Sequence, residues 1–97
     1  MAYDPGAIEA TLAAAVGDDP GLIAELRIAL VDSAERALAQ MEAADTGDAW
    51  GAAAWRLRGL AASFGAVRLM ALATEAATAG APDPVLLGKL KRVVSRL

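Results

Sequence analysis

Apolar residues recur at helical spacing along most of the chain, and short polar breaks separate the repeating segments. Asp4-Pro5 and Asp19-Pro20 open the first two segments. Aspartate before proline is typical of a helix start, because the carboxylate caps free backbone N–H groups and proline needs no partner there. The first apolar stripe consists of Ile8, Leu12 and Val16. Gly17 ends it, so the pattern predicts a short helix. The polar turn Asp45-Thr46-Gly47 ends the second stripe, so the pattern predicts a long helix. This stripe consists of Leu22, Ile23, Leu26, Leu30, Ala34, Leu38 and Met41.

Three more helical segments follow. Asp48 is placed to cap the first of them, and Gly65 predicts a kink or a new start before a stripe that continues to Gly80. Asp83-Pro84 repeats the capped start. The inward-facing residues expected here are Trp50, Ala53, Leu57, Leu60, Ala61 and Phe64, then Leu69, Leu72 and Ala76, then Leu86, Leu90, Val93 and Leu97. Residues 1–97 are therefore expected to form one all-α domain, an up-and-down four-helix bundle with a short N-terminal lid helix.

Composition removes several classes of function. The chain is 57% hydrophobic but only 4% aromatic, and 26 of its 97 residues are alanine, which favours closely packed helices. It has no cysteine and no histidine, which excludes a disulfide scaffold, a thiolate zinc site and an imidazole general base. No nucleophile–base pair or inward-facing carboxylate cluster indicates catalysis, and we expect no metal and no cofactor.

Charge and hydropathy limit the location and the partners. The net charge of -3 argues against general nucleic-acid binding. No apolar run approaches the roughly 20 residues that a membrane span needs. Residues 1–6 lack the basic-then-apolar pattern of a signal peptide. A cytoplasmic protein with no membrane partner is therefore expected.

The charges are unevenly placed along the chain. Residues 1–48 hold 10 acidic and 2 basic side chains, whereas residues 49–97 hold 2 acidic and 7 basic ones. Two explanations stay open: an acidic half packs beside a basic half, or a basic surface receives an acidic partner. In the last segment the cations are expected to form a solvated face rather than a membrane-binding one; they are Lys89, Lys91, Arg92 and Arg96.

One helical segment carries an unusual outward face. At about 100° of rotation per residue, Trp55 lies opposite the apolar stripe, and four residues lie within about 60° of it: Gly51, Arg58, Gly59 and Ala62. A glycine inside a helix costs up to about 1 kcal/mol relative to alanine. A smooth patch with one protruding tryptophan suits the close approach of another protein. Two structural alternatives stay open: Trp55 folds over the glycines, or it packs beneath the N-terminal helix as core.

The segment Ala54-Trp55-Arg56-Leu57-Arg58-Gly59, followed by Ala61-Ala62-Ser63-Phe64-Gly65-Ala66 and Leu69, resembles the signature of histidine-containing phosphotransfer (HPt) domains. The usual pattern of that family is Ala-His-x-Leu-Lys-Gly-Ser, then a few small residues, then Gly-Ala and a leucine. Such domains are four-helix bundles that relay phosphoryl groups between receiver domains in bacterial and plant His–Asp signalling. The resemblance covers essentially the whole chain, because the helix starts and the long second helix have comparable spacing.

The resemblance breaks at the phosphate acceptor. Trp55 stands where the family carries its histidine. An imidazole accepts a phosphoryl group through a ring nitrogen lone pair, whereas an indole nitrogen is only a donor. Arg58 keeps the charge of the family lysine, Gly59 matches the glycine that lets a receiver approach, and Leu60 replaces the family serine. Three departures together fit a site released from catalysis better than a single engineered replacement.

The resemblance therefore implies a docking surface without the chemistry. Such a pseudo-HPt module binds a receiver domain or a histidine-kinase-related protein and competes with true phosphotransfer proteins. The partner-binding residues implied are Gly51, Trp55, Arg56, Arg58, Gly59, Ala62 and Arg68. The alternative is a structural or self-association bundle, a homodimer that uses an exposed Trp55. No enzymatic activity is expected from either.

Overall fold

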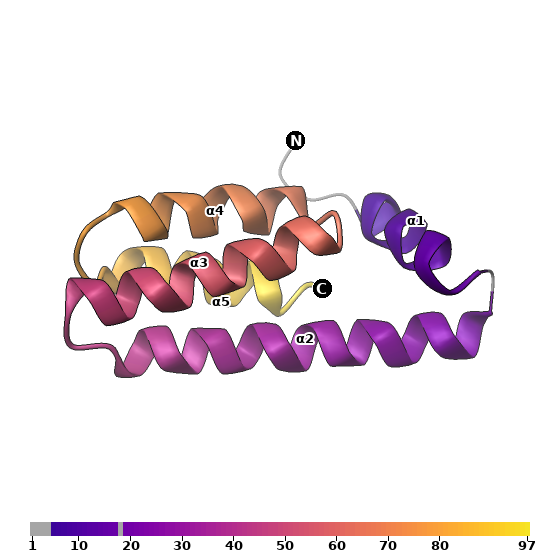
Figure 1. Cartoon of the computed structure of the whole chain (residues 1–97), viewed down its shortest axis with the longest axis horizontal. Helices are drawn as coiled ribbons and strands as arrows, with labels where there is room; N and C mark the ends of the chain where they lie inside the picture. Colours follow the sequence, from indigo (N-terminus) through magenta and orange to yellow (C-terminus); the bar gives the residue numbers. More distant parts are fainter. Residues whose placement is uncertain (1–4, 18) are drawn as a thin grey trace.

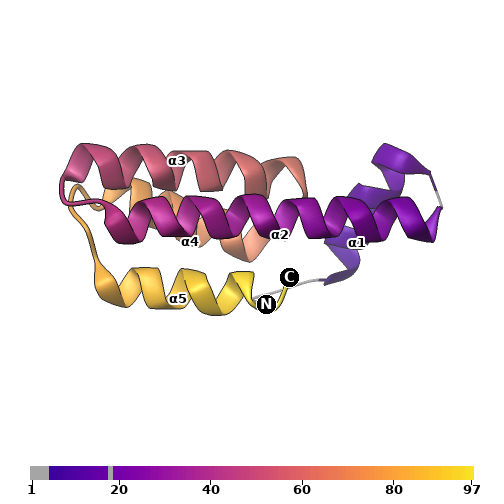
Figure 2. The ribbon, with the colours of Figure 1, turned by 90° about the horizontal axis from the view of Figure 1, so that it is seen from below.

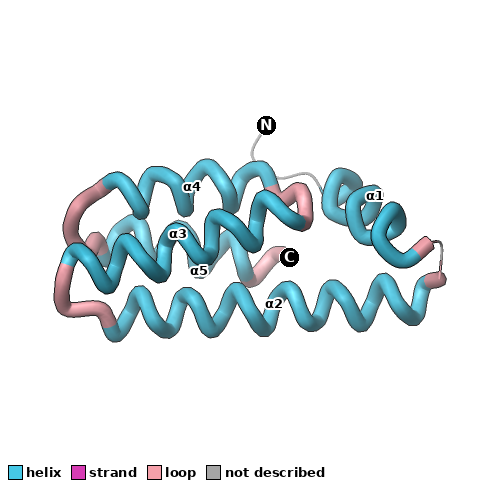
Figure 3. Tube along the Cα trace, in the orientation of Figure 1, coloured by secondary structure: helices cyan, strands magenta, loops and turns pink. Residues whose placement is uncertain are grey.

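The computed structural model describes residues 5–17 and 19–97, which form five helices and contain no strand (Figure 3). The helices are α1 (Pro5–Val16), α2 (Pro20–Ala43), α3 (Gly47–Ser63), α4 (Val67–Thr78) and α5 (Pro84–Val94). The all-α class expected from the apolar periodicity is confirmed. Gly65, with φ +68°, marks a new start rather than a kink, because α3 ends before it and α4 begins after it.

Two helix starts use the aspartate caps that the sequence indicates. The carboxylate of Asp19 accepts hydrogen bonds of 2.9 and 3.2 Å from backbone N–H groups in the first turn of α2. Asp83 accepts a similar pair, 3.0 and 3.1 Å long, at the start of α5. These bonds satisfy donors that have no partner within the helix. The cap expected at Asp4 lies outside the described residues, as does Asp18.

The cap of α3 differs from the one expected. The hydroxyl of Thr46, rather than the carboxylate of Asp48, accepts the hydrogen bond, from the backbone N–H of Ala49 at 3.1 Å. The backbone of Thr46 is extended, as an N-cap requires, whereas Asp48 already lies in the first helical turn. There its negative charge still favours the positive end of the helix dipole.

Helices α2 to α5 run in alternating directions around one core (Figures 1 and 2). Each packs on two of the others: α2 and α4 both lie against α3 and α5. At 24 residues α2 is the longest, so its N-terminal part extends beyond the other three helices, and α1 packs across this extension on α2 alone. The overhanging part of α2 is therefore covered by one helix instead of two.

Arg27 ties this extension to two other parts of the chain. Its side chain is 24% exposed and donates a 2.7 Å hydrogen bond to the carboxylate of Glu9 on α1. A second bond, also 2.7 Å, runs from Arg27 Nη1 to the backbone carbonyl of Leu97. Ile8 and Leu12, both fully buried, add the apolar face of α1. The ion pair of Glu9 with Arg27 and the buried face of Ile8 and Leu12 thus help to hold α1 in place.

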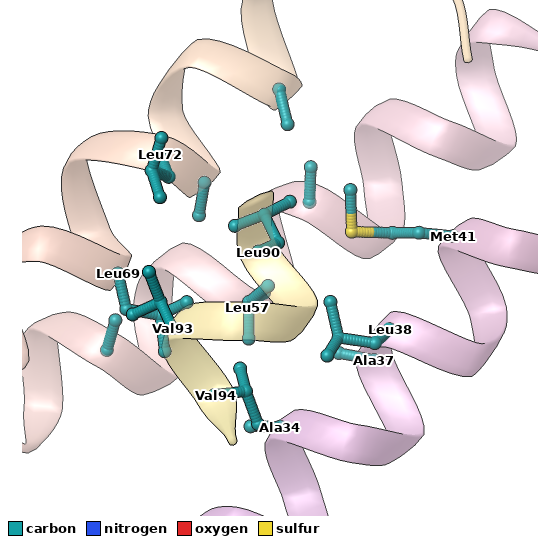
Figure 4. Close-up of a cluster of buried hydrophobic side chains, with 14 of the residues drawn as sticks. Ala34, Ala37, Leu38, Met41, Leu57, Leu69, Leu72, Leu90, Val93 and Val94 are labelled. Carbon is teal, nitrogen blue, oxygen red and sulfur yellow. The ribbon is translucent and has the colours of Figure 1, made fainter. Parts of the chain in front are cut away.

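The core draws on all the helices that surround it. Figure 4 shows its larger side chains meeting between the ribbons: Leu38 and Met41 of α2, Leu57 of α3, Leu69 and Leu72 of α4, and Leu90, Val93 and Val94 of α5. Among the residues that the structure describes, 22 hydrophobic ones are buried, and eight of these are alanine: Ala34, Ala37, Ala53, Ala54, Ala61, Ala66, Ala73 and Ala76. Since alanine ends at Cβ, the helices approach one another closely at these positions.

Burial departs from the expected stripes in two ways. The expectation for Leu22 is wrong: this side chain is 46% exposed. It lies in the first turn of α2, on the extension, where α1 alone is available to cover it. Conversely, six residues outside the stripes are buried, namely Ala37, Ala54, Ala66, Ala73, Leu87 and Val94. A helix that packs on two neighbours buries a face wider than a single stripe.

Two glycines meet where α3 begins. A Cβ atom added to Gly47 would clash with the backbone carbonyl oxygen of Gly80, in the connection between α4 and α5. Gly80 has φ +80°, a conformation that favours glycine. The start of α3 and the α4–α5 connection are therefore in direct backbone contact.

Candidate functional site

The two tryptophans of α3 have opposite environments. Trp50 is 1% exposed, and its indole Nε1–H donates a 2.8 Å hydrogen bond to the backbone carbonyl of Ala76 on α4. Trp55 is 50% exposed. The outward position that helical geometry predicts for Trp55 is confirmed, and the alternative that it packs as core is wrong. Trp50 fixes α3 against α4, whereas Trp55 is available to another molecule.

Arg58 braces the exposed indole on the side of α4. Its guanidinium carbon lies over the Trp55 ring, 5.3 Å from the ring centroid, at the distance of a cation–π contact. Arg58 Nε also donates a 2.9 Å hydrogen bond to the hydroxyl of Thr74, which in turn donates to the backbone carbonyl of Met70. The guanidinium of Arg58 is thus bonded to α4 and stacked on Trp55.

Small residues leave space around this pair. A Cβ atom added to Gly59 would meet nothing within 4 Å, so the surface beside Trp55 is open there. Gly51 is half-buried, and a Cβ atom at that position would lie 3.8 Å from the carbonyl oxygen of Ala77 on α4. Ala62 is exposed on the last turns of α3. The open glycine of the site is therefore Gly59, while Gly51 mainly brings α3 close to α4.

A groove of about 540 Å³ lies on the other side of Trp55, between α2 and α3. Its α3 wall consists of Trp55, Arg56, Gly59, Leu60 and Ser63, and its α2 wall consists of Ser33, Arg36, Ala37 and Gln40. Three of the expected site residues therefore line one groove. The α2 wall was missed by the sequence reasoning, because its polar residues have the spacing of an ordinary solvent-facing side.

The arginines at this site carry no compensating carboxylate from α3 or α4. Arg56 donates a hydrogen bond to the amide oxygen of Gln40, a neutral partner, and the partner of Arg58 is a hydroxyl. Arg36 pairs at 2.8 Å with Asp32, one turn earlier on α2, and both side chains are well exposed. The site therefore presents positive charge beside an aromatic ring and open backbone.

The remaining expected cations lie elsewhere. Arg68 is exposed in the first turn of α4 and makes no hydrogen bond or ion pair with the residues that the structure describes. The four cations of the C-terminal segment are exposed, as expected for a solvated face; three lie on α5 and Arg96 follows it. Lys91 pairs with Glu42 of α2 at 2.9 Å. That pair joins the basic half of the chain to its acidic half. Packing of the two halves against each other therefore accounts for part of the charge asymmetry.

No family model, curated protein or solved structure matches this chain. Within residues 5–17 and 19–97, no group of three or more potential ligand side chains is placed to hold a metal ion. Nor does any described helix combine the length and the apolar character that crossing a membrane requires. Of the hydroxyls near Trp55, that of Ser63 donates a 2.9 Å hydrogen bond to the carbonyl of Gly59 within its own helix.

Proposed function

We propose that this chain is a pseudo-HPt signalling module: an up-and-down four-helix bundle, with α1 as its lid, that works in the cytoplasm. It binds a receiver domain or a histidine-kinase-related protein of a His–Asp phosphorelay and carries no phosphoryl group itself. The observation that supports this most is the exposed Trp55 at the position of the acceptor histidine, with the open Gly59 one turn further on. The resemblance of the surrounding residues supplies the class of partner.

The chemistry of Trp55 explains why docking would not lead to transfer. The lone pair of the indole nitrogen belongs to the aromatic system, so this nitrogen donates a hydrogen bond but does not attack phosphorus. The stacked Arg58 adds a guanidinium, which also only donates. A partner bound here therefore meets donors and an aromatic surface, and its phosphoryl group stays where it is.

The same residues suit binding. Tryptophan and arginine are the side chains most enriched among interface residues that dominate affinity. The stacked pair of Trp55 and Arg58 is already ordered by Thr74, so docking needs little further loss of side-chain freedom. Gly59 lets a partner's backbone approach α3 without meeting a side chain. These features fit a module that occupies a partner and blocks its true phosphotransfer protein.

Calorimetric titration of receiver domains, each with and without the phosphoryl mimic beryllofluoride, tests the proposal. We expect saturable binding by at least one receiver encoded near this chain, and loss of that binding with Gly59→Glu. Ala39→Glu is the matched control, because Ala39 is exposed on the side of α2 that faces α5 and the substitution adds the same charge. Failure of every receiver to bind, or equal loss with both variants, would contradict the proposal.

Self-association is a second candidate, and one observation favours it. Ile28 is 69% exposed on the extension of α2, beside two shallow depressions that it helps to line. An exposed isoleucine on a helix covered by one neighbour is a candidate contact between two copies. Light scattering across a concentration series tests this with Ile28→Glu. Val85→Glu is the control, since Val85 is 70% exposed on α5. A mass equal to one chain at all concentrations removes this candidate.

A further inference from the structure

The groove between α2 and α3 is lined by two arginines and by no carboxylate. Arg36 and Arg56 stand on opposite walls, and the other polar groups are two hydroxyls and the amide of Gln40. This contrasts with the rest of α2, where the exposed carboxylates of residues 25, 32, 35 and 42 follow the helix. A local positive groove in a chain of net charge -3 needs an explanation in terms of what enters it.

We propose that this groove binds a short acidic segment of the partner protein, with a carboxylate on each side of an apolar residue. The carboxylates lie against Arg36 and Arg56, and the apolar side chain lies against Trp55 and Leu60. The inference rests on the proposed function for the location of the docking surface, and it adds the chemistry of the partner and the wall of α2.

The length of the groove fits a segment of extended chain. On α2 its residues run from Ser33 to Gln40, and on α3 from Trp55 to Ser63. At 1.5 Å of rise per residue, each wall spans about 10 to 12 Å. An extended chain advances about 3.3 Å per residue, so about three residues fit between the two ends. A segment of about three residues is what that length accommodates.

Both guanidiniums are free to change partners. The pair of Arg36 and Asp32 lies at the surface, with side chains 71% and 64% exposed, and such pairs add little stability. Arg56 is bonded to the neutral Gln40. A carboxylate accepts two parallel hydrogen bonds from a guanidinium, a stronger contact than either present one. An incoming acidic segment therefore gains more than it displaces.

The floor of the groove admits the segment's backbone. Ala37 of α2 and Gly59 of α3 face it with the smallest side chains in the sequence, and Gly59 has open space above it. Trp55 forms one end wall and is held from behind by Arg58. An apolar side chain placed over Gly59 would lie beside the Trp55 indole, which lines the same groove.

The exposed cations of α5 provide the comparison that makes the inference testable. Lys89 and Arg92 are exposed and near each other along the helix, yet neither lines the groove that contains Trp55. If charge alone attracted acidic segments, α5 would bind them at least as well as the groove. Specific binding must instead depend on the two groove arginines.

The test is an NMR titration of the ¹⁵N-labelled full chain with the peptide acetyl-Glu-Glu-Leu-Glu-Glu-amide. We expect shifts in the amide signals of residues 33–40 and 55–63 that saturate. The peptide with glutamine in place of every glutamate should cause none. Arg36→Gln combined with Arg56→Gln should weaken binding about tenfold. Lys89→Gln combined with Arg92→Gln, which removes the same charge, should change it less than about twofold.

Two results would overturn the inference: shifts centred on α5, or equal weakening by the two double variants. Receiver titration separates this failure from failure of the proposed function. If a receiver binds the double variant Arg36→Gln/Arg56→Gln normally but does not bind Gly59→Glu, the proposed docking surface is upheld. The proposal that an acidic segment enters the groove is then wrong. Peptide binding in the groove without any receiver binding upholds the inference and removes the receiver as partner.

Discussion

The guanidinium of Arg58 lies over the indole of Trp55, 5.3 Å from its centroid, while the Nε atom of the same arginine is bonded to Thr74 on α4. An exposed tryptophan on a helix would ordinarily change rotamer freely. Here a charge held by the next helix lies over the ring, and the same ring lines the groove between α2 and α3. The position of the exposed Trp55 side chain is thus linked, through Arg58, to the packing of α3 on α4.

Replacing the arginine should release the indole. We expect Arg58→Gln to increase the fast motion of the Trp55 side chain, measured as a lower heteronuclear NOE at its Nε1–H. The Nε1–H of Trp50, buried and bonded to Ala76, is an internal reference that should not change. Because the substitution removes a surface cation–π contact and the hydrogen bond to Thr74, the free energy of unfolding should fall by about 1–2 kcal/mol. An unchanged NOE at Trp55 would mean that the stacking does not restrain the ring.

The two tryptophans should differ sharply in their contribution to stability. Trp50→Phe removes the hydrogen bond to Ala76 and leaves a void in the core, so the free energy of unfolding should drop by about 2 kcal/mol. Trp55→Phe removes exposed surface and should change it by less than about 0.5 kcal/mol. Urea denaturation followed by circular dichroism measures both. Equal effects of the two substitutions would contradict the assignment of Trp50 to the core and Trp55 to the surface.

Two glycines of α3 should respond to alanine in opposite directions. Gly47→Ala places a methyl group against the carbonyl of Gly80, and the resulting shift of backbone should cost about 2 kcal/mol. Gly59→Ala meets open space and should raise the free energy of unfolding by up to about 1 kcal/mol, because alanine is the better helix former. Thermal unfolding of the two variants checks the signs. Stabilisation by Gly59→Ala would mean that the glycine is kept for something other than folding.

Removing Arg27 should loosen α1 without unfolding the rest. Arg27→Gln loses the bond to Glu9 and the charge that meets the carbonyl of Leu97, and α1 packs on α2 alone. The free energy of local opening of α1 should fall by about 1 kcal/mol, so its amide hydrogen exchange should be about fivefold faster. Exchange in α4 should stay the same. Arg36→Gln is the control, because its ion pair with Asp32 is exposed. Uniform acceleration along the chain would contradict a separate α1.

The helices could be predicted because each carries its own signal. Asp19 and Asp83 cap through bonds to backbone only two and three residues away, so the sequence contains the whole interaction. The inward position of Trp50 and the outward position of Trp55 follow from the rotation per residue alone. Thr46 shows where local reasoning fails. Two capping residues lie two positions apart, and the path of the preceding loop decides which of them caps.

The groove could not be predicted, for a related reason. The spacing of Ser33, Arg36 and Gln40 shows only that they share a face of α2. That this face meets Trp55 depends on how α2 and α3 are rotated and offset, which the packing of the whole core determines. Leu22 was predicted to be buried and is exposed. Its spacing fits the apolar stripe, but it lies on the extension of α2, which α3, α4 and α5 do not reach. The sequence therefore predicts the α3 wall of the groove, whose residues resemble a known motif, but not the α2 wall.

The alanines at the helix contacts have a thermodynamic consequence. Of the 22 buried hydrophobic residues in the described part of the chain, eight have no side-chain carbon beyond Cβ. Unfolding therefore newly hydrates less apolar surface than in a leucine-filled domain of this length, and the heat capacity of unfolding, which follows that surface, should lie at the low end of the usual range of about 12–15 cal/mol/K per residue. A small heat capacity flattens the curve of stability against temperature. The protein would then keep a similar margin of stability from cold to warm conditions, with a late and gradual loss on heating.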